Sequence, residues 1–145
     1  MTALQLARSE SIRLQRPVTV RHSGLMASRN WGAGWTAFID TDGNGLQSGA
    51  TETTLRVGAP AAAPITAIGN GAAATHITFN GDGSASAGSA IVIFCNDNAL
   101  QVDSQSRSRA LLISRVGRVR IATDNNHDGV PEDDAGVAIA SCTAP

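Results

Sequence analysis

The hydrophobic period of the sequence changes at Pro17, and this change limits the fold more than any other feature. Before Pro17, apolar or small residues recur every three or four positions, as on one face of an amphipathic helix: Leu4, Ala7, Ser11 and Leu14. Proline ends such a helix because it lacks a donor and moves the preceding residue away from helical geometry. Residues 1–16 are therefore predicted to be helical. Because no cap signal precedes them, we expect Met1 to interrupt a longer helix.

After Pro17 the period is two, and short apolar runs alternate with clusters of glycine, asparagine and aspartate. The runs are "PVTVRH", "GWTAFI", "TTLRV", "ITAI", "THITF", "SAIVIF", "RALLISR", "RVRIA" and "GVAIASC". Short strands with turn signals at this spacing are typical of antiparallel sheets. The predicted fold is α+β, with an N-terminal amphipathic helix packed on antiparallel β-sheets. Residues 17–145 are predicted to form a single β-rich head.

Charge is uneven along the chain although its sum is small. The net charge is -1, all 11 basic residues are arginine, and five of them fall between Arg107 and Arg120. A local cluster of this kind predicts a local partner, which the overall charge does not. No stretch reaches the roughly 20 apolar residues of a membrane span, and no signal peptide is recognisable. If the protein is exported, we expect the targeting segment to be missing from this sequence.

The two cysteines, Cys95 and Cys142, are far apart and lack a metal-binding spacing. A disulfide between them is favoured over two free thiols, with Cys142 fixing a final strand. This pairing would place the domain in an oxidising compartment.

Two acidic loops resemble the start of a calcium loop. Alternating oxygen donors followed by a glycine occur in both: Asp40, Asp42 and Asn44 in one, Asp124, Asn126 and Asp128 in the other. A calcium loop of the hand type closes with a glutamate at position twelve. That position holds Thr51 in the first loop, where Glu52 is one residue late, and Ala135 in the second. The same residues favour ordinary turns, so turns and weak calcium sites are both open interpretations.

Nothing in the sequence predicts an enzyme or a cofactor. There is no nucleophile motif and no phosphate-binding loop with its lysine. The three histidines, His22, His76 and His127, have no recognisable catalytic partners and are interpreted as surface or core residues.

The segment "ISRVGRVRIA" is the best candidate for a binding site. If Ile113, Gly117, Val119 and Ile121 face the core, then Arg118 and Arg120 project together from the other face, about 7 Å apart. Two guanidinium groups at this separation can each bind a DNA phosphate without sequence preference. Arg115, Arg107 and Arg109 are candidates to extend the patch. The alternative is that these arginines pair with nearby aspartates and keep an edge strand soluble.

Several segments together resemble the GspH/FimT family of type IV minor pilins and type II secretion pseudopilins. They are "LQLARSESIRLQRPVTV", "NWGAGWTAFIDTDGNG", "TLRV", "ITFNGDGSA" and "RALLISRVGRVRIA" with its "GRVR". The resemblance implies a type IV pilin-like fold, in which a long helix precedes a β-rich head and its first half anchors the protein in the membrane. That half is absent here, so the chain resembles a head without its transmembrane segment.

The resemblance leaves two functions open. In FimT-like minor pilins the "GRVR" motif implies capture of double-stranded DNA for natural transformation, which points to Gly117, Arg118 and Arg120. GspH-like pseudopilins are instead structural and pack in a tip complex without DNA, and "NWGAGW" is the candidate contact surface. The expected partners are DNA and other minor pilins or the major pilin. The expected location is the inner membrane, with a periplasmic head, and the extracellular pilus of a Gram-negative bacterium.

Overall fold

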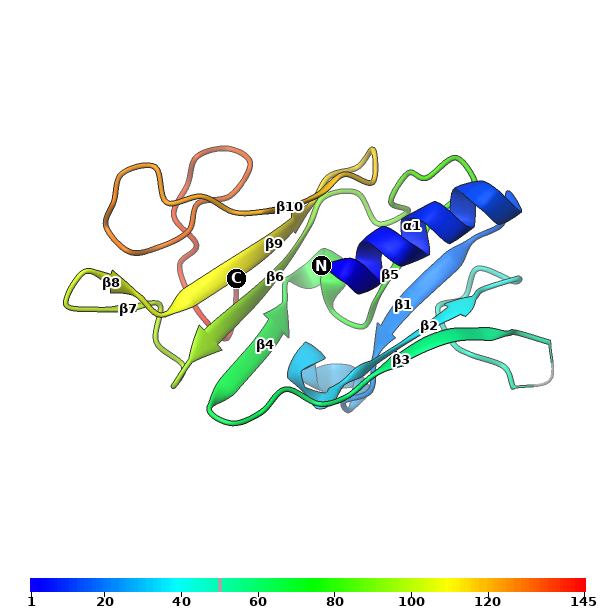
Figure 1. Cartoon of the computed structure of the whole chain (residues 1–145), viewed down its shortest axis with the longest axis horizontal. Helices are drawn as coiled ribbons and strands as arrows, with labels where there is room; N and C mark the ends of the chain where they lie inside the picture. The colour runs from blue at the N-terminus through cyan, green and yellow to red at the C-terminus, as the bar shows by residue number, and fades with distance from the viewer. Residues whose placement is uncertain (50) are drawn as a thin grey trace.

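The computed structural model describes residues 1–49 and 51–145, in which one N-terminal helix precedes antiparallel strands (Figure 1). The helix and the three short 3-10 helices are α1 (Thr2–Leu14), η1 (Met26–Ser28), η2 (Trp31–Ala33) and η3 (Gly71–Ala73). The strands are β1 (Val18–His22), β2 (Trp35–Ile39), β3 (Thr54–Gly58), β4 (Ile65–Gly69), β5 (His76–Phe79), β6 (Ala90–Asn96), β7 (Gln101–Val102), β8 (Gln105–Ser106), β9 (Ser108–Ile113) and β10 (Val119–Ile121).

Helix α1 follows the predicted pattern. Its buried residues are Leu4, Ala7 and Ser11, and its C-cap residue, Gln15, adopts a left-handed conformation with φ 53°. Met1 is the N-cap residue and makes no side-chain capping bond. The helical period before Pro17 therefore gives one buried face and one solvated face.

Two four-stranded sheets form the head. The first has the order β3-β2-β1-β5 and the second the order β10-β9-β6-β4, and all of their pairings are antiparallel. The main core contains residues of α1 and of both sheets, including Leu4, Val20 and Leu111. The α+β prediction is confirmed, and the helix contributes to the same core as both sheets.

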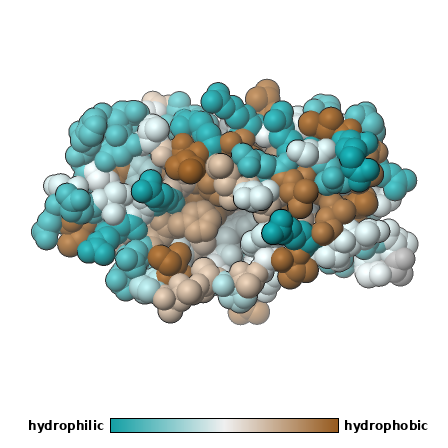
Figure 2. All heavy atoms as spheres, viewed as in Figure 1, coloured by the Kyte–Doolittle hydropathy of each residue, from teal (hydrophilic) through white to brown (hydrophobic). Residues whose placement is uncertain are grey.

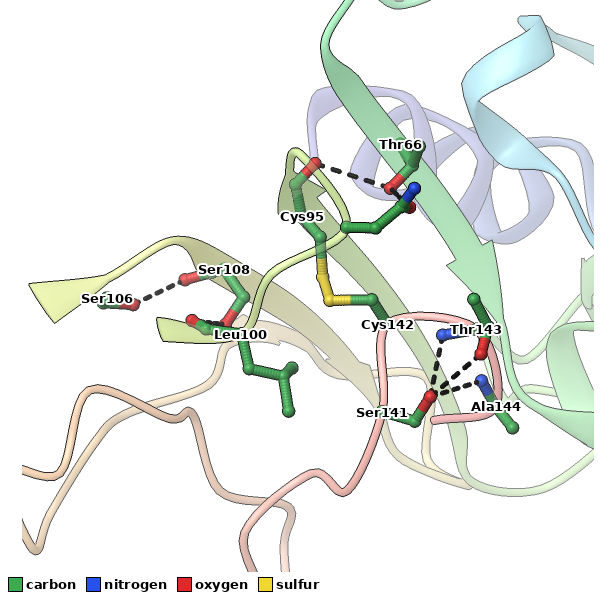
Figure 3. Close-up of a disulfide and its surroundings, with 10 residues drawn as sticks. Thr66, Cys95, Leu100, Ser106, Ser108, Ser141, Cys142, Thr143 and Ala144 are labelled. Atoms are coloured by element: carbon green, nitrogen blue, oxygen red, sulfur yellow. Dashed lines mark hydrogen bonds between the residues drawn. A yellow bond between two sulfur atoms is a disulfide. The ribbon is translucent and has the colours of Figure 1, made fainter. Parts of the chain in front are cut away.

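The outer face of the second sheet carries a smaller core under the C-terminal segment. Ile139 and Cys142 pack there against Ile93, Ala110 and Leu112. Cys142 is bonded to Cys95 at the end of β6, so the predicted disulfide is confirmed (Figure 3). The bond fixes the end of the chain to the sheet.

The strand predictions fail at the C-terminus. Eight of the nine expected runs overlap observed strands, but "GVAIASC" forms no strand and makes only the isolated bridge between Glu132 and Ala138. The segment covers the face of the second sheet instead of pairing with its edge. The short polar hairpin of β7 and β8 was not expected.

An apolar recess opens where α1 begins. Its lining includes Leu4, Trp31, Trp35, Ala67 and Phe94. Figure 2 shows tan and brown residues around a hollow near the middle of this face. Among the described residues, none of the helices has the length and apolar character needed to cross a bilayer.

Candidate nucleic-acid interface

The "GRVR" motif lies at the tight turn between β9 and β10. The amide of Gly117 donates to the Ser114 carbonyl (2.8 Å), and the amide of Ser114 donates to the Arg118 carbonyl (2.9 Å). Gly117 has φ +76°, and a side chain there would overlap the Gly83 carbonyl oxygen. The glycine of the motif is therefore required by the backbone of the turn.

The two arginines of the motif share one face of the hairpin. Val119 lies opposite Ile113 and packs against the main core, whereas Arg120 lies opposite Leu112 on the other face. Arg118 and Arg120 line one shallow hollow together with Asp134. This is the arrangement that strand parity predicts. Ile121 was expected to face the core but is 46% exposed, because β10 is an edge strand.

Arg120 is paired with an aspartate. Its Nε and Nη2 atoms donate to Asp134 Oδ1 at 3.0 and 2.5 Å. Arg115 and Arg118 are exposed, and no carboxylate lies within 4.0 Å of either in the described part of the chain. The alternative of aspartate pairing therefore holds for Arg120 and leaves Arg115 and Arg118 available to a ligand.

One further arginine approaches the turn from the helix. Arg8 Nε donates to the Gly83 carbonyl (3.1 Å), and its Nη2 donates to the Val116 carbonyl (3.3 Å). Arg8 and Arg118 line the same small hollow beside Gly117. The sequence gives no sign of this contact, because Arg8 and Arg118 are 110 positions apart.

Arg107 and Arg109 do not extend this patch. They lie at the other end of β9, where they line a separate groove beside Phe94. By strand alternation Arg109 shares the face of Leu111, whereas Arg120 shares the face of Leu112. About 17 Å of strand separates Arg109 from Ser114, at roughly 3.3 Å per residue. Arg107 and Arg109 therefore lie on a different surface from Arg118 and Arg120.

The second acidic loop is a closed turn. Asp124 accepts from the amides of Asp128 (3.1 Å) and Gly129 (2.8 Å). The side chain of Asn126 accepts from the Asp128 amide and donates to the Asp128 carboxylate, at 3.0 Å in both cases. Both oxygens of Asp124 are thus occupied by the backbone.

The first acidic loop gathers three carboxylates. An oxygen from each of Asp40, Asp42 and Glu52 lies within 4.8 Å of the others. Asn44 accepts from the Leu46 amide (2.6 Å) and donates to Asp42 (2.6 Å). Glu52 comes one residue after the position at which a calcium loop places its glutamate, yet its carboxylate lies with those of Asp40 and Asp42.

Neither tryptophan of "NWGAGW" offers an exposed contact surface. Trp31 is buried, and its Nε1 donates to the Ala73 carbonyl (2.8 Å), while Trp35 is half-buried against the core. The hydrophobic residues just before them are exposed instead, with Leu25 at 84% and Met26 at 62%.

Two of the three histidines are sheltered. His22 is buried and contacts the Ala74 carbonyl through Nε2 (2.9 Å), and its pKa is lowered mainly by burial. The pKa of His76 is lowered by burial and then by the charge of Arg21. His127 is exposed in the second acidic loop. His76 Nδ1 lies 2.8 Å from the hydroxyl of its neighbour Thr75.

The chain matches one family model and two solved structures. The family is described as type II transport protein GspH, and the match covers residues 1–117. A crystal structure of the type IV minor pilin FimU from Pseudomonas aeruginosa has 24% identity and a TM-score of 0.67, covering 97% of this chain and 87% of that chain. A second crystal form of FimU gives 23% identity and the same TM-score, covering 97% and 92%. A search of curated proteins found no significant match.

Proposed function

The chain belongs to the GspH family, and from this premise we propose that it is a minor type IV pilin whose head binds double-stranded DNA for uptake in natural transformation. The observation that carries the proposal is the β9–β10 hairpin, which holds Arg115 and Arg118 exposed and without acidic partners in the described residues. The proposed role is non-enzymatic and needs no cofactor.

The hairpin suits contact with phosphates better than recognition of bases. Its arginines project from an edge strand and a turn, which a DNA backbone can approach without a groove. A guanidinium binds phosphate oxygens through paired donors. Arg118 and Arg115 are free to make such contacts, and Arg120 would exchange Asp134 for a phosphate.

The affinity of one head is expected to be weak. Only two or three phosphates would be contacted, and the carboxylate of Asp134 lies next to Arg120. In a filament, or together with other pilins, several weak contacts on one DNA molecule would add up through effective concentration. We propose a location in the cell envelope of a Gram-negative bacterium, in the inner membrane and the extracellular pilus.

The test is a DNA-binding titration over a series of salt concentrations. We expect Arg118→Ala/Arg120→Ala to weaken binding and to reduce the slope of log K against log salt by about 1.8, at 0.9 per lost phosphate contact. The matched control is Arg107→Ala/Arg109→Ala, which removes the same charge from the other end and face of β9. Equal affinity and slope in the two double variants would refute the proposed site.

A structural role in a pilus or secretion tip complex is the second candidate. The observation that favours it is the pair of exposed apolar side chains, Leu25 and Met26, next to the element that carries Trp31. Such residues are suited to a protein contact. Saturable binding to another minor pilin that is lost in Leu25→Asp, together with no DNA binding, would support this role over the first.

A further inference from the structure

The loop between β2 and β3 contains a cluster of carboxylates that resembles a cation site. Asp40, Asp42 and Glu52 each offer an oxygen within 4.8 Å of the others. Asp40 is fully buried, Glu52 is 6% exposed, and Asp42 lies at the surface. Oxygens bound to one Ca²⁺ lie at most about 5 Å apart, because each bond is about 2.3–2.6 Å long. The separation therefore fits a shared ion.

Asp40 has an oxygen that lacks a partner. Its Oδ2 accepts from the Thr19 hydroxyl (2.5 Å) and from the Gly45 amide (3.0 Å). Its Oδ1 is buried and makes no hydrogen bond. An unsatisfied carboxylate oxygen in the interior is costly, since it has lost its water and gained nothing in return. A bound cation would remove this cost.

The hydroxyl groups of the neighbouring strands do not donate to Asp40 Oδ1. The Thr19 hydroxyl donates its proton to Asp40, so the Thr78 hydroxyl must be the donor in its 2.5 Å contact with Thr19. This chain of hydroxyls runs from β5 through β1 and ends at Oδ2. It fixes the orientation of the Asp40 carboxylate and leaves Oδ1 open.

The other two carboxylates are held in place by the loop itself. Glu52 accepts from the amides of Thr41 and Ser48, at 2.8 Å each. Asp42 accepts from the amide and the side chain of Asn44, at 3.1 and 2.6 Å. Each carboxylate oxygen has two lone pairs, so these bonds leave acceptors for a metal. The ligand positions are thus set before any ion binds.

No side-chain cation neutralises the cluster in the described ranges. The two ion pairs found there, Arg13 with Glu10 and Arg120 with Asp134, lie elsewhere. Arg21 approaches the loop, but its Nη1 donates to the Gly45 carbonyl (2.7 Å) instead of a carboxylate. Three carboxylates, two of them buried, therefore lie together without an ion-pair partner in the described ranges.

We propose that the β2–β3 loop binds one Ca²⁺ ion through Asp40 Oδ1 and one oxygen each from Asp42 and Glu52, with water completing its coordination. An all-oxygen, carboxylate-rich set suits a hard cation and disfavours zinc or copper. Mg²⁺ demands near-ideal octahedral geometry and gives up its water reluctantly, whereas Ca²⁺ accepts the flexible, irregular coordination that a loop offers, so this set suits Ca²⁺ better. The ion would join the end of β2 to the start of β3.

The test uses the chain as it stands, freed of metal with a chelator. Calorimetric titration with Ca²⁺ is expected to show one saturable site, with a Kd of about 10⁻⁵ to 10⁻³ M as in sensors and extracellular modules. Millimolar Ca²⁺ should raise the Tm by a few degrees, because an ion that binds only the folded state stabilises it. Millimolar Mg²⁺ should raise it less.

Two conservative variants locate the site. Asp42→Asn changes an exposed ligand, so it should fold and should weaken Ca²⁺ binding at least tenfold. Glu52→Gln should weaken binding as much, but it keeps an acceptor for only one of the two loop amides, so its melt without Ca²⁺ is compared with that of the wild type to separate lost folding from lost binding. Asp124→Asn, the matched change in the second acidic loop, should bind Ca²⁺ as the wild type does. No saturable Ca²⁺ binding, an equal response to Mg²⁺, or an equal loss in Asp124→Asn would overturn the proposal.

Discussion

The two acidic loops share a sequence pattern and differ in how they satisfy it. Each has an aspartate at position one, aspartate or asparagine at positions three and five, and a glycine at position six. In both, the glycine amide donates to the first aspartate, and a nearly buried glutamate accepts from the amide of position two. The common pattern therefore encodes a common turn.

The difference lies in the amide of position five. In both loops this amide donates to the side chain of position three, but in the second loop the Asp128 amide also donates to Asp124. As a result both carboxylate oxygens of Asp124 accept a hydrogen bond, whereas Asp40 in the first loop keeps a buried oxygen without a partner. This additional hydrogen bond to Asp124 is the difference between a first aspartate whose two oxygens are both paired and one that keeps a buried, unpaired oxygen.

The largest expected effect concerns the anchor of the second loop. The Cys95–Cys142 bond spans 47 residues, and the chain-entropy model assigns a closed loop of this size about 4 kcal/mol of stability. Cys95→Ala/Cys142→Ala should lose about this much in urea unfolding, and limited proteolysis should then cut first between residues 123 and 142. First cleavage between residues 40 and 53 would contradict the idea that only the second loop depends on the bond.

A smaller effect is expected from removing the first aspartate of the closed turn. Asp124→Ala leaves the amides of Asp128 and Gly129 without their carboxylate, which should cost about 1–2 kcal/mol in urea unfolding. Added Ca²⁺ should not restore this stability. Recovery with Ca²⁺ would mean that the second loop also binds the ion.

Acidification should destabilise the fold through the two sheltered histidines, His22 and His76. The folded-state pKa values of His22 and His76 are lowered, mainly by burial, so the unfolded chain binds protons more readily than the folded chain. Their contribution is complete above about pH 6.5, the unfolded value, and is lost as the pH falls below it.

Thermal melts between pH 7.5 and 5 measure this loss. His76, which lies against Gly45 of the first loop, should give a shallower pH dependence when changed to glutamine. His127→Gln is the control, because His127 is exposed. Equal slopes for His76→Gln and the wild type would show that the sheltered histidine does not titrate with unfolding.

Local patterns predicted most of the fold because they report burial. The helix before Pro17 and eight strands follow directly from periods of 3.6 and two. The same reasoning fails for "GVAIASC", where Ile139 is buried and Val137 is 61% exposed without any partner strand. Alternating hydrophobic residues reveal that one side of a segment is buried. Strand pairing also requires a free sheet edge beside that segment.

The candidate sites show the same limit. Parity correctly places Arg118 and Arg120 on one face, since it depends only on neighbouring residues. Other features of the sites depend on how distant or irregular segments fold back. They are the contact of Arg8 with the turn, the ion pair of Asp134 with Arg120, and the position of Glu52 near Asp40. Loop spacing alone did not place Glu52 with Asp40 and Asp42, because a glutamate one residue past position twelve can still bring a carboxylate oxygen to the same point.

The smallest expected effect links the second loop to DNA. Asp134 occupies Arg120 at the surface, and a surface ion pair is worth up to about 1 kcal/mol. Asp134→Asn should therefore free Arg120 and strengthen DNA binding about two- to fivefold at low salt, an advantage that shrinks as salt screens the charges. The matched control is Asp103→Asn, which makes the same charge change at an exposed residue whose φ of 49° asparagine tolerates. An equal gain in both variants would reflect net charge alone. A gain confined to Asp134→Asn would show that this one carboxylate, which follows the second loop in the chain, limits access to the arginine hairpin.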